Sequence, residues 1–193
     1  MTTPGTQGGG GQANPAHVDF AWKIIIAGHG GVGKSTLIHR YVYKQFKDNT
    51  AMTIGCSHHS QYVCREDKTI NLILWDLGGQ KRFDMLHPAY VTGAAAGYAL
   101  FDMSAVETLQ EIDKWVQLIR KYNPPGTPVL LVGTKYDLVQ TQEQLDNVCA
   151  LASKKVADHG LDAFMVTSAK LNVNVDETIN YMVDYLLWKN GGA

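Results

Sequence analysis

The chain has 193 residues, with 17 basic and 18 acidic side chains and a formal net charge of −1. This length fits one domain with a sizeable core. The balanced charge does not indicate binding to nucleic acid or to anionic lipid. There is no apolar stretch near the roughly 20 residues that span a bilayer, no signal-peptide layout and no closed disulfide framework from three cysteines, so we expect a soluble, cytoplasmic protein.

The first residues differ in kind from the rest. A run of four glycines, Gly8 to Gly11, lies among Thr, Gln, Asn and Pro, with almost nothing to bury. Such a segment does not recover the entropy lost on ordering. We predict a disordered, glycine-rich tail over residues 1–19 and a single domain over residues 20–190.

Apolar runs then alternate with helical stretches, which predicts a mostly parallel sheet with helices on both faces. The expected strands are Ile24–Ala27, Gln61–Cys64, Ile70–Trp75, Ala94–Phe101, Val129–Val132 and Phe164–Thr167. The polar turn at residues 66–68 joins the second and third strands as an antiparallel hairpin at the sheet edge. The predicted fold class is therefore α/β, a six-stranded and mostly parallel sheet with one antiparallel edge strand.

The helices are indicated by apolar periodicity and by their starts. Two polar pairs have the spacing of a capping box, Ser104 with Glu107 and Thr141 with Gln144, and a third pair, Asn174 with Glu177, opens the last helix. The second of these helices is expected to end near Gly160. We predict one helix after each pair.

One motif predicts a nucleotide triphosphate. Gly28-His29-Gly30-Gly31-Val32-Gly33-Lys34-Ser35-Thr36 matches the phosphate-binding loop pattern, between an apolar strand and a helix. The glycines let backbone N–H groups surround a phosphate, and the helix N-terminus adds a favourable dipole. Lys34 reaches the β- and γ-phosphates, and Ser35 offers its hydroxyl to magnesium.

A second motif, Trp75-Asp76-Leu77-Gly78-Gly79-Gln80, ends an apolar strand, where ligands bind in open α/β sheets. A carboxylate at Asp76 suits a water-mediated magnesium contact, Gly79 leaves room for a γ-phosphate, and Gln80 can orient an attacking water. The motif alone is common in turns, but its place downstream of the phosphate loop makes it specific. Thr53, 18 residues beyond Ser35, is expected to contact magnesium and the γ-phosphate.

A third pair of segments predicts guanine as the base. In Gly133-Thr134-Lys135-Tyr136-Asp137, the Asp137 carboxylate can accept from both N1–H and the exocyclic amine of guanine. Adenine lacks this donor pair, so a buried carboxylate would reject it. Lys135 can lay its aliphatic stem over the base plane. Thr167-Ser168-Ala169-Lys170 offers backbone N–H groups for the guanine carbonyl oxygen.

With these motifs in this order, residues 20–190 resemble the small GTPases of the Ras superfamily, whose fold is the P-loop G domain. The resemblance implies GTP or GDP with Mg²⁺ as ligands, Phe46 against the guanine edge, and a Gly30 at which an added side chain abolishes hydrolysis. It implies that Gln80, Lys34 and Thr53 are catalytic and that Ser35, Thr53 and Asp76 serve the metal.

The subfamily is less sharply indicated. Arg82-Phe83 resembles Rab and Ran proteins, whereas Leu77-Gly78-Gly79 and Thr134-Lys135-Tyr136-Asp137 resemble septation-control GTPases. The family usually has Asn at the position of Thr134, so we expect one hydrogen bond between the base loop and the phosphate loop to be lost. His29 and Ser57-His58-His59-Ser60 fit neither subgroup.

The implied function is a molecular switch with slow hydrolysis, with effectors, an exchange factor and an activating protein as partners. No cysteine lies near the last residue and Thr2 replaces the glycine of a myristoylation signal, so we expect no direct lipid anchor and recruitment to membranes or scaffolds through a partner. We expect a monomer. The spacing from Ser35 to Thr53 leaves no room for a kinase lid or a heterotrimer-type helical insertion. A pseudo-GTPase scaffold stays open.

Overall fold

The computed structural model describes residues 15, 17–48, 52–80 and 85–191, and these form one sheet flanked by helices. The strands are β1 Phe20–Gly28, β2 Cys56–Arg65, β3 Lys68–Leu77, β4 Ala96–Asp102, β5 Val129–Thr134 and β6 Ala163–Val166. The helices are α1 Lys34–Tyr43, α2 His87–Val91, α3 Ile112–Lys121, α4 Gln142–His159 and α5 Val175–Lys189, with short 3₁₀ helices η2 Val106–Glu111 and η3 Tyr136–Leu138.

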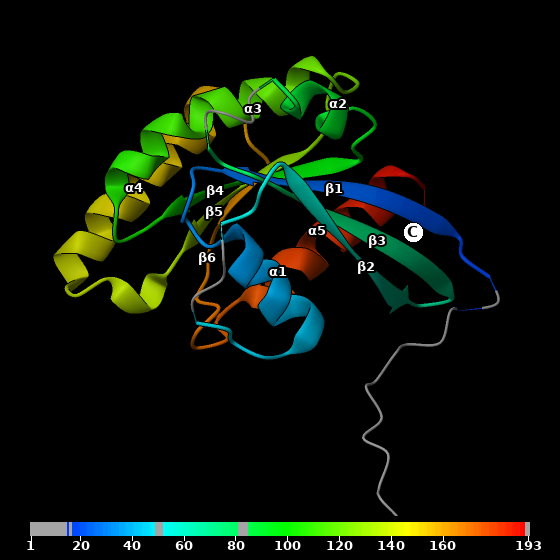
Figure 1. The fold of residues 1–193 in the computed structure, drawn as a ribbon, viewed down its shortest axis with the longest axis horizontal. Coiled ribbons are helices and arrows are strands. Elements are labelled where there is room, and N and C mark those ends of the chain that lie inside the picture. The colour runs from blue at the N-terminus through cyan, green and yellow to red at the C-terminus, as the bar shows by residue number, and fades with distance from the viewer. Residues whose placement is uncertain (1–14, 16, 49–51, 81–84, 192–193) are drawn as a thin grey trace, which may run out of the picture.

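The strand order is β2-β3-β1-β4-β5-β6, and only the β2–β3 pair is antiparallel. α1 and α5 cover one face of the sheet, and α2, α3 and α4 cover the other (Figure 1). The predicted fold class, a mostly parallel six-stranded sheet with one antiparallel edge strand, is confirmed.

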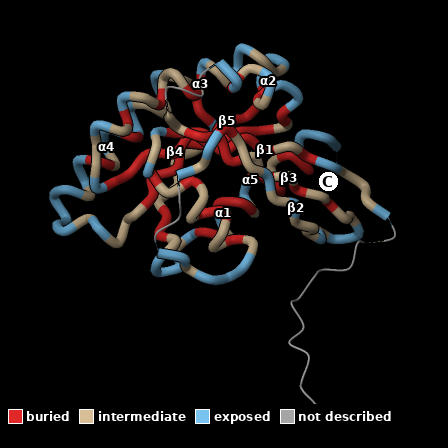
Figure 2. Tube along the Cα trace, in the orientation of Figure 1, coloured by how far each residue is buried: buried red, intermediate tan, exposed pale blue. Residues whose placement is uncertain are grey.

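The core explains why the strands read as continuous apolar runs. Successive residues of a strand point to opposite faces, so Ile24 and Ile26 join the apolar cluster under α1 and α5. Ile25 and Ala27 join the cluster under α3 and α4. Figure 2 shows buried residues along the central strands and exposed residues along the outer surfaces of the helices. Because both faces are covered, a parallel strand needs no polar side.

The observed strands are mostly longer than the apolar runs that predicted them. β2 begins at Cys56, five residues before the predicted Gln61, because its polar residues pair with β3 through to the Cys56–Leu77 register. The short helix α2 was not predicted. The predicted domain start falls at the first residue of β1, and Asp19 precedes it. The backbone N–H of Asp19 donates to the Thr69 carbonyl at 2.8 Å, so the chain already contacts the sheet there. Most of the predicted tail lies outside the described residues.

One of the two capping boxes was wrong. The Ser104 hydroxyl donates to Asp102 at 2.6 Å, and η2 begins two residues later with no side-chain cap. Asn174 takes the N-cap position of α5 as predicted, although its φ is 52° and its side-chain amide donates to the Val166 carbonyl. Thr141 does cap α4, since its hydroxyl accepts from the Gln144 N–H at 3.1 Å.

The topology brings the carboxyl ends of the parallel strands to one edge of the sheet. β1 lies at the switch point, because the chain runs from it to β2 and β3 on one side and later to β4, β5 and β6 on the other. Ligands of open α/β sheets bind outside this point. None of the helices within the described residues is long and apolar enough to cross a membrane.

Candidate functional site

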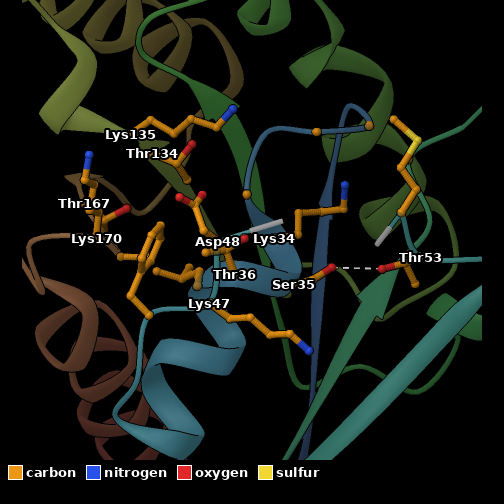
Figure 3. A pocket seen from close by; sticks show the side chains of 18 of the residues that line it. Lys34, Ser35, Thr36, Lys47, Asp48, Thr53, Thr134, Lys135, Thr167 and Lys170 are labelled. Carbon is orange, nitrogen blue, oxygen red and sulfur yellow. Dashed lines mark hydrogen bonds between the residues drawn. The ribbon is translucent and has the colours of Figure 1, made fainter. Parts of the chain in front are cut away.

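A pocket of about 470 Å³ lies at this edge of the sheet, a size typical of small-molecule sites (Figure 3). Most of the residues predicted from sequence line it: Gly30, Gly31, Gly33, Lys34, Ser35, Thr36, Phe46, Thr53, Gly79, Gln80, Thr134, Lys135, Asp137, Ala169 and Lys170. Figure 3 shows Lys34, Ser35 and Thr53 toward one end and Thr134, Lys135 and Lys170 toward the other. The structure therefore separates the residues predicted to bind phosphate (the phosphate end) from those predicted to bind the base (the base end).

Four predicted residues support the pocket without lining it: Gly28, Val32, Asp76 and Ser168. Gly28 ends β1 with φ of 153°, and a Cβ there would lie 2.4 Å from the Leu100 carbonyl oxygen, so only glycine fits. Thr167 of the predicted base-binding segment lines the pocket as well, and so do residues that the sequence motifs missed: Leu37, Lys47, Asp48, Met52 and Leu138. Lys47 and Asp48 directly follow Phe46, and this adjacency was the one signal that could have found them.

The phosphate end is arranged for an anion. Lys34 is 5% exposed, and its Nζ donates to the carbonyls of Gly28 at 2.9 Å and His29 at 2.8 Å. Burial lowers the pKa of Lys34 to about 8, although the negative charges of Asp76 and Glu111 act to raise it. No side chain caps the N-terminus of α1 at Gly33, so this end of the helix suits a phosphate.

Three oxygen-bearing side chains converge beside Lys34 from three different segments. The Ser35 and Thr53 hydroxyl oxygens are 2.9 Å apart, and Thr53 donates to Asp76 Oδ2 at 2.8 Å. Ser35 donates to the same carboxylate oxygen. Asp76 is 1% exposed, and its Oδ1 is buried and has no hydrogen-bond partner among the described residues. Hydroxyl and carboxylate oxygens are the ligands that Mg²⁺ prefers, so this donor set fits magnesium.

The loop after β3 lies directly against the phosphate loop. A Cβ on Gly79 would come within 2.5 Å of the Gly30 backbone nitrogen, so glycine is required there. A Cβ on Gly30 would lie 3.8 Å from Gln80 Cγ. The Gln80 amide donates to the Met52 sulfur at 2.8 Å, and thus links the loop after β3 to the segment that carries Thr53.

At the base end, Asp137 and Ser168 are joined although 31 residues separate them. The Ser168 hydroxyl donates to Asp137 Oδ1 at 2.5 Å, which orients the carboxylate. Lys135 has a positive φ of 56° and its ammonium pairs with Asp102 at 2.6 Å. The pairing holds the Lys135 stem along the pocket wall, where the sequence predicts contact with a base plane.

The expectation that Thr134 breaks the link between the base loop and the phosphate loop was wrong. Its hydroxyl lies 2.5 Å from the Val32 carbonyl oxygen and 2.9 Å from that of Phe101. Both partners only accept, so the single hydroxyl proton is shared between the two carbonyl oxygens. The threonine side chain is long enough for its hydroxyl to reach the Val32 carbonyl. Thr134 therefore keeps the base loop joined to the phosphate loop.

Thr134→Val, which keeps the shape and removes the hydroxyl, is expected to speed GTP and GDP release equally, by about tenfold. The two buried carbonyls would lose their donor, and the loops would separate. Stopped-flow release of labelled nucleotides measures this. Thr127→Val is the matched control. The Thr127 hydroxyl donates to the Pro124 carbonyl at 2.7 Å in a similar way, but Thr127 does not line the pocket. Equal release rates in Thr134→Val and wild type would contradict the link.

Comparison with known proteins identifies the family. The sequence model of the Ras family matches residues 23–187. The chain belongs to the Ras family.

This small GTPase is similar to Rab proteins over most of its length. It is 34% identical to the Ras-related protein Rab5A of Oryza sativa subsp. japonica, with 91% of this chain and 84% of the relative covered. It is 34% identical to human Rab-22A, with 80% and 78% covered, and 31% identical to human Rab-3A, with 92% and 79% covered. The chain is thus a Rab-like small GTPase of the Ras superfamily. Arg82 and Phe83, which suggested this subgroup, lie outside the described residues.

Proposed function

We propose that this GTPase is a guanine-nucleotide switch that binds GTP and GDP with Mg²⁺, hydrolyses GTP slowly and signals through loops that respond to the γ-phosphate. One observation carries the proposal. Ser35 of α1, Thr53 of the segment before β2 and Asp76 of β3 meet at one point beside Lys34. A metal–phosphate group at that point would hold these three segments together, and its loss on hydrolysis would release them.

Each side chain has a proposed role in hydrolysis. Lys34 exchanges the loop carbonyls for β- and γ-phosphate oxygens and stabilises their developing charge. Ser35 and Thr53 offer hydroxyl oxygens to magnesium, and Asp76 binds it through water. When bound, Mg²⁺ neutralises charge on the β- and γ-phosphates. Gln80 orients the attacking water, and Gly30 leaves it space.

The intrinsic rate should be low, since none of the described residues that line the pocket is an arginine. An activating protein that inserts one would raise the rate by roughly 10³–10⁵-fold. An exchange factor and effectors complete the proposed partners, and their subfamily role lies in trafficking, septation or polarity. We further propose a cytoplasmic monomer that a partner brings to membranes or scaffolds.

Binding and turnover of the purified full chain test this function. We expect tight, Mg²⁺-dependent binding of GTP and GDP, no competition by ATP, and slow phosphate release from GTP. Binding without any turnover, even with cell extract present, would instead support a pseudo-GTPase scaffold. Failure to bind GTP would refute the switch.

Ser35→Asn is expected to weaken GTP far more than GDP, because the larger amide would displace the magnesium ion that Ser35 would help to hold, and the charge of that ion would matter more for the triphosphate. Release rates of both nucleotides, with and without EDTA, measure this. EDTA should speed GTP release from wild type but hardly change the variant. Ser153→Asn, at an exposed site on α4, is the control. Equal weakening of both nucleotides would show that Ser35 only packs the loop.

A further inference from the structure

A buried histidine on α2 reaches the loop that follows β3. His87 is 1% exposed, and its Nε2 lies 3.0 Å from the Gly78 carbonyl oxygen. Because a carbonyl oxygen only accepts, Nε2 carries the proton and donates. The ring also packs against Trp115 of α3, with ring centroids 5.3 Å apart. Neither the motifs nor the proposed chemistry assigns a role to this side chain.

Gly78 is held on both sides of its backbone. Its N–H donates to the Gly55 carbonyl at 2.8 Å, two residues after Thr53, and its own carbonyl accepts from His87. The two contacts tie the Thr53 segment, the loop after β3 and α2 to one residue. A buried carbonyl without a partner is costly, so removal of the His87 donor would favour another orientation of this peptide.

The orientation of that peptide decides where the next N–H points. In a trans peptide the carbonyl of Gly78 and the N–H of Gly79 point in opposite directions. With the carbonyl directed at His87, the Gly79 N–H is directed away from α2. Gly79 lines the pocket and packs on the phosphate loop, where a Cβ would lie 2.3 Å from the Gly28 carbonyl oxygen.

We infer that His87 is a positioning residue of the GTPase: its hydrogen bond to Gly78 fixes the Gly78–Gly79 peptide so that the Gly79 N–H faces the terminal phosphate. The inference rests on the proposed function. A γ-phosphate oxygen of GTP accepts a hydrogen bond from this N–H, whereas GDP has no γ-phosphate. Through Trp115, the same ring connects the phosphate-sensing loop to the middle of α3.

Two substitutions separate the hydrogen bond from the packing. His87→Phe keeps an aromatic ring against Trp115 and removes the donor. His87→Gln removes the ring, but its amide nitrogen reaches about as far as Nε2. We expect His87→Phe to release a slowly hydrolysed GTP analogue about tenfold faster than wild type and to hydrolyse GTP more slowly, with GDP release unchanged. His87→Gln should recover most of both losses.

A purely structural role would give another pattern. Equal acceleration of GTP-analogue and GDP release in His87→Phe, or wild-type rates for both, would overturn the inference. Thermal unfolding of the GDP complexes checks that the variants fold. Should His87→Phe fail to fold, ¹⁵N spectra of the wild-type GDP complex decide, because an unprotonated Nε2 on His87 would overturn the hydrogen bond and a protonated one supports it. A wild type that does not bind GTP would refute the proposed function itself.

Discussion

Gln80→Leu is expected to lower the rate of single-turnover GTP hydrolysis by on the order of 10²-fold, while GTP and GDP binding stays close to wild type. Leucine has similar bulk but cannot hydrogen-bond a water molecule. An activating protein should restore little of the rate, since its arginine stabilises charge on the phosphates but does not orient the water. Phosphate release after rapid mixing measures the effect, with and without cell extract.

The structure explains why this residue has room to act. Gln80 follows Gly79, which packs on the phosphate loop, and the Gln80 side chain passes beside Gly30. In this structure its amide is held by the Met52 sulfur. This contact is weak for an amide donor, so a bound water between Gln80 and a γ-phosphate would replace it at little cost.

Gln117→Leu is the matched control, because it makes the same change at an exposed site on α3. It should hydrolyse GTP at the wild-type rate. If Gln80→Leu also hydrolysed GTP at that rate, alone and with extract, Gln80 would not orient the water. A parallel loss of GTP affinity would indicate a structural role.

The second large effect concerns the base. Asp137→Asn is expected to weaken GTP by on the order of 10³-fold and to make xanthosine triphosphate the preferred ligand. The carboxylate is proposed to accept from guanine N1–H and the exocyclic amine. An asparagine amide at this position would place an N–H donor opposite the guanine amine, which is also a donor, so no hydrogen bond forms between them. Xanthine has a carbonyl there, which accepts from the new amide.

The geometry favours a large effect at this position. Ser168 donates to Asp137 Oδ1 and so holds the carboxylate in one orientation, next to a pocket wall that includes Lys135 and Lys170. A pre-oriented acceptor discriminates strongly, because a wrong base leaves it unpaired. In the variant, either amide orientation keeps Ser168 bonded to the new side chain, so the loop itself should hold its shape.

Competition among GTP, xanthosine triphosphate and ATP measures this preference. Asp158→Asn, on the exposed side of α4, is the control for the loss of one charge, and it should bind GTP as wild type does. A variant at position 137 that still prefers GTP would show that Asp137 does not read the base. Equal binding of ATP by wild type would show the same.

The sequence predicted the sheet, the pocket and the starts of α4 and α5, but the capping box predicted at Ser104 does not form. Each strand in the middle of the sheet carries a long apolar run, and the phosphate loop follows the first of these strands. The sequence therefore predicted the order of the strands along the chain and the position of the pocket. Capping boxes are local patterns with several competing solutions. At Ser104 a different local contact forms, because the carboxylate of Asp102, two residues earlier, accepts from the Ser104 hydroxyl. The Asn174 amide likewise donates to the Val166 carbonyl, eight residues earlier, and not to its own helix.

By itself, the sequence determined the α/β fold class, the phosphate loop and the set of residues that converge on one pocket, because spacing along a strand–loop–helix unit fixes which side chains reach a ligand. Only the tertiary structure decided the contacts between distant segments. Thr134 still reaches Val32, Ser168 orients Asp137, and His87 holds Gly78. The first two of these hydrogen bonds join residues 102 and 31 positions apart, and the third joins α2 to the loop nine residues before it. Their lengths and directions depend on how the sheet and helices bring these segments together.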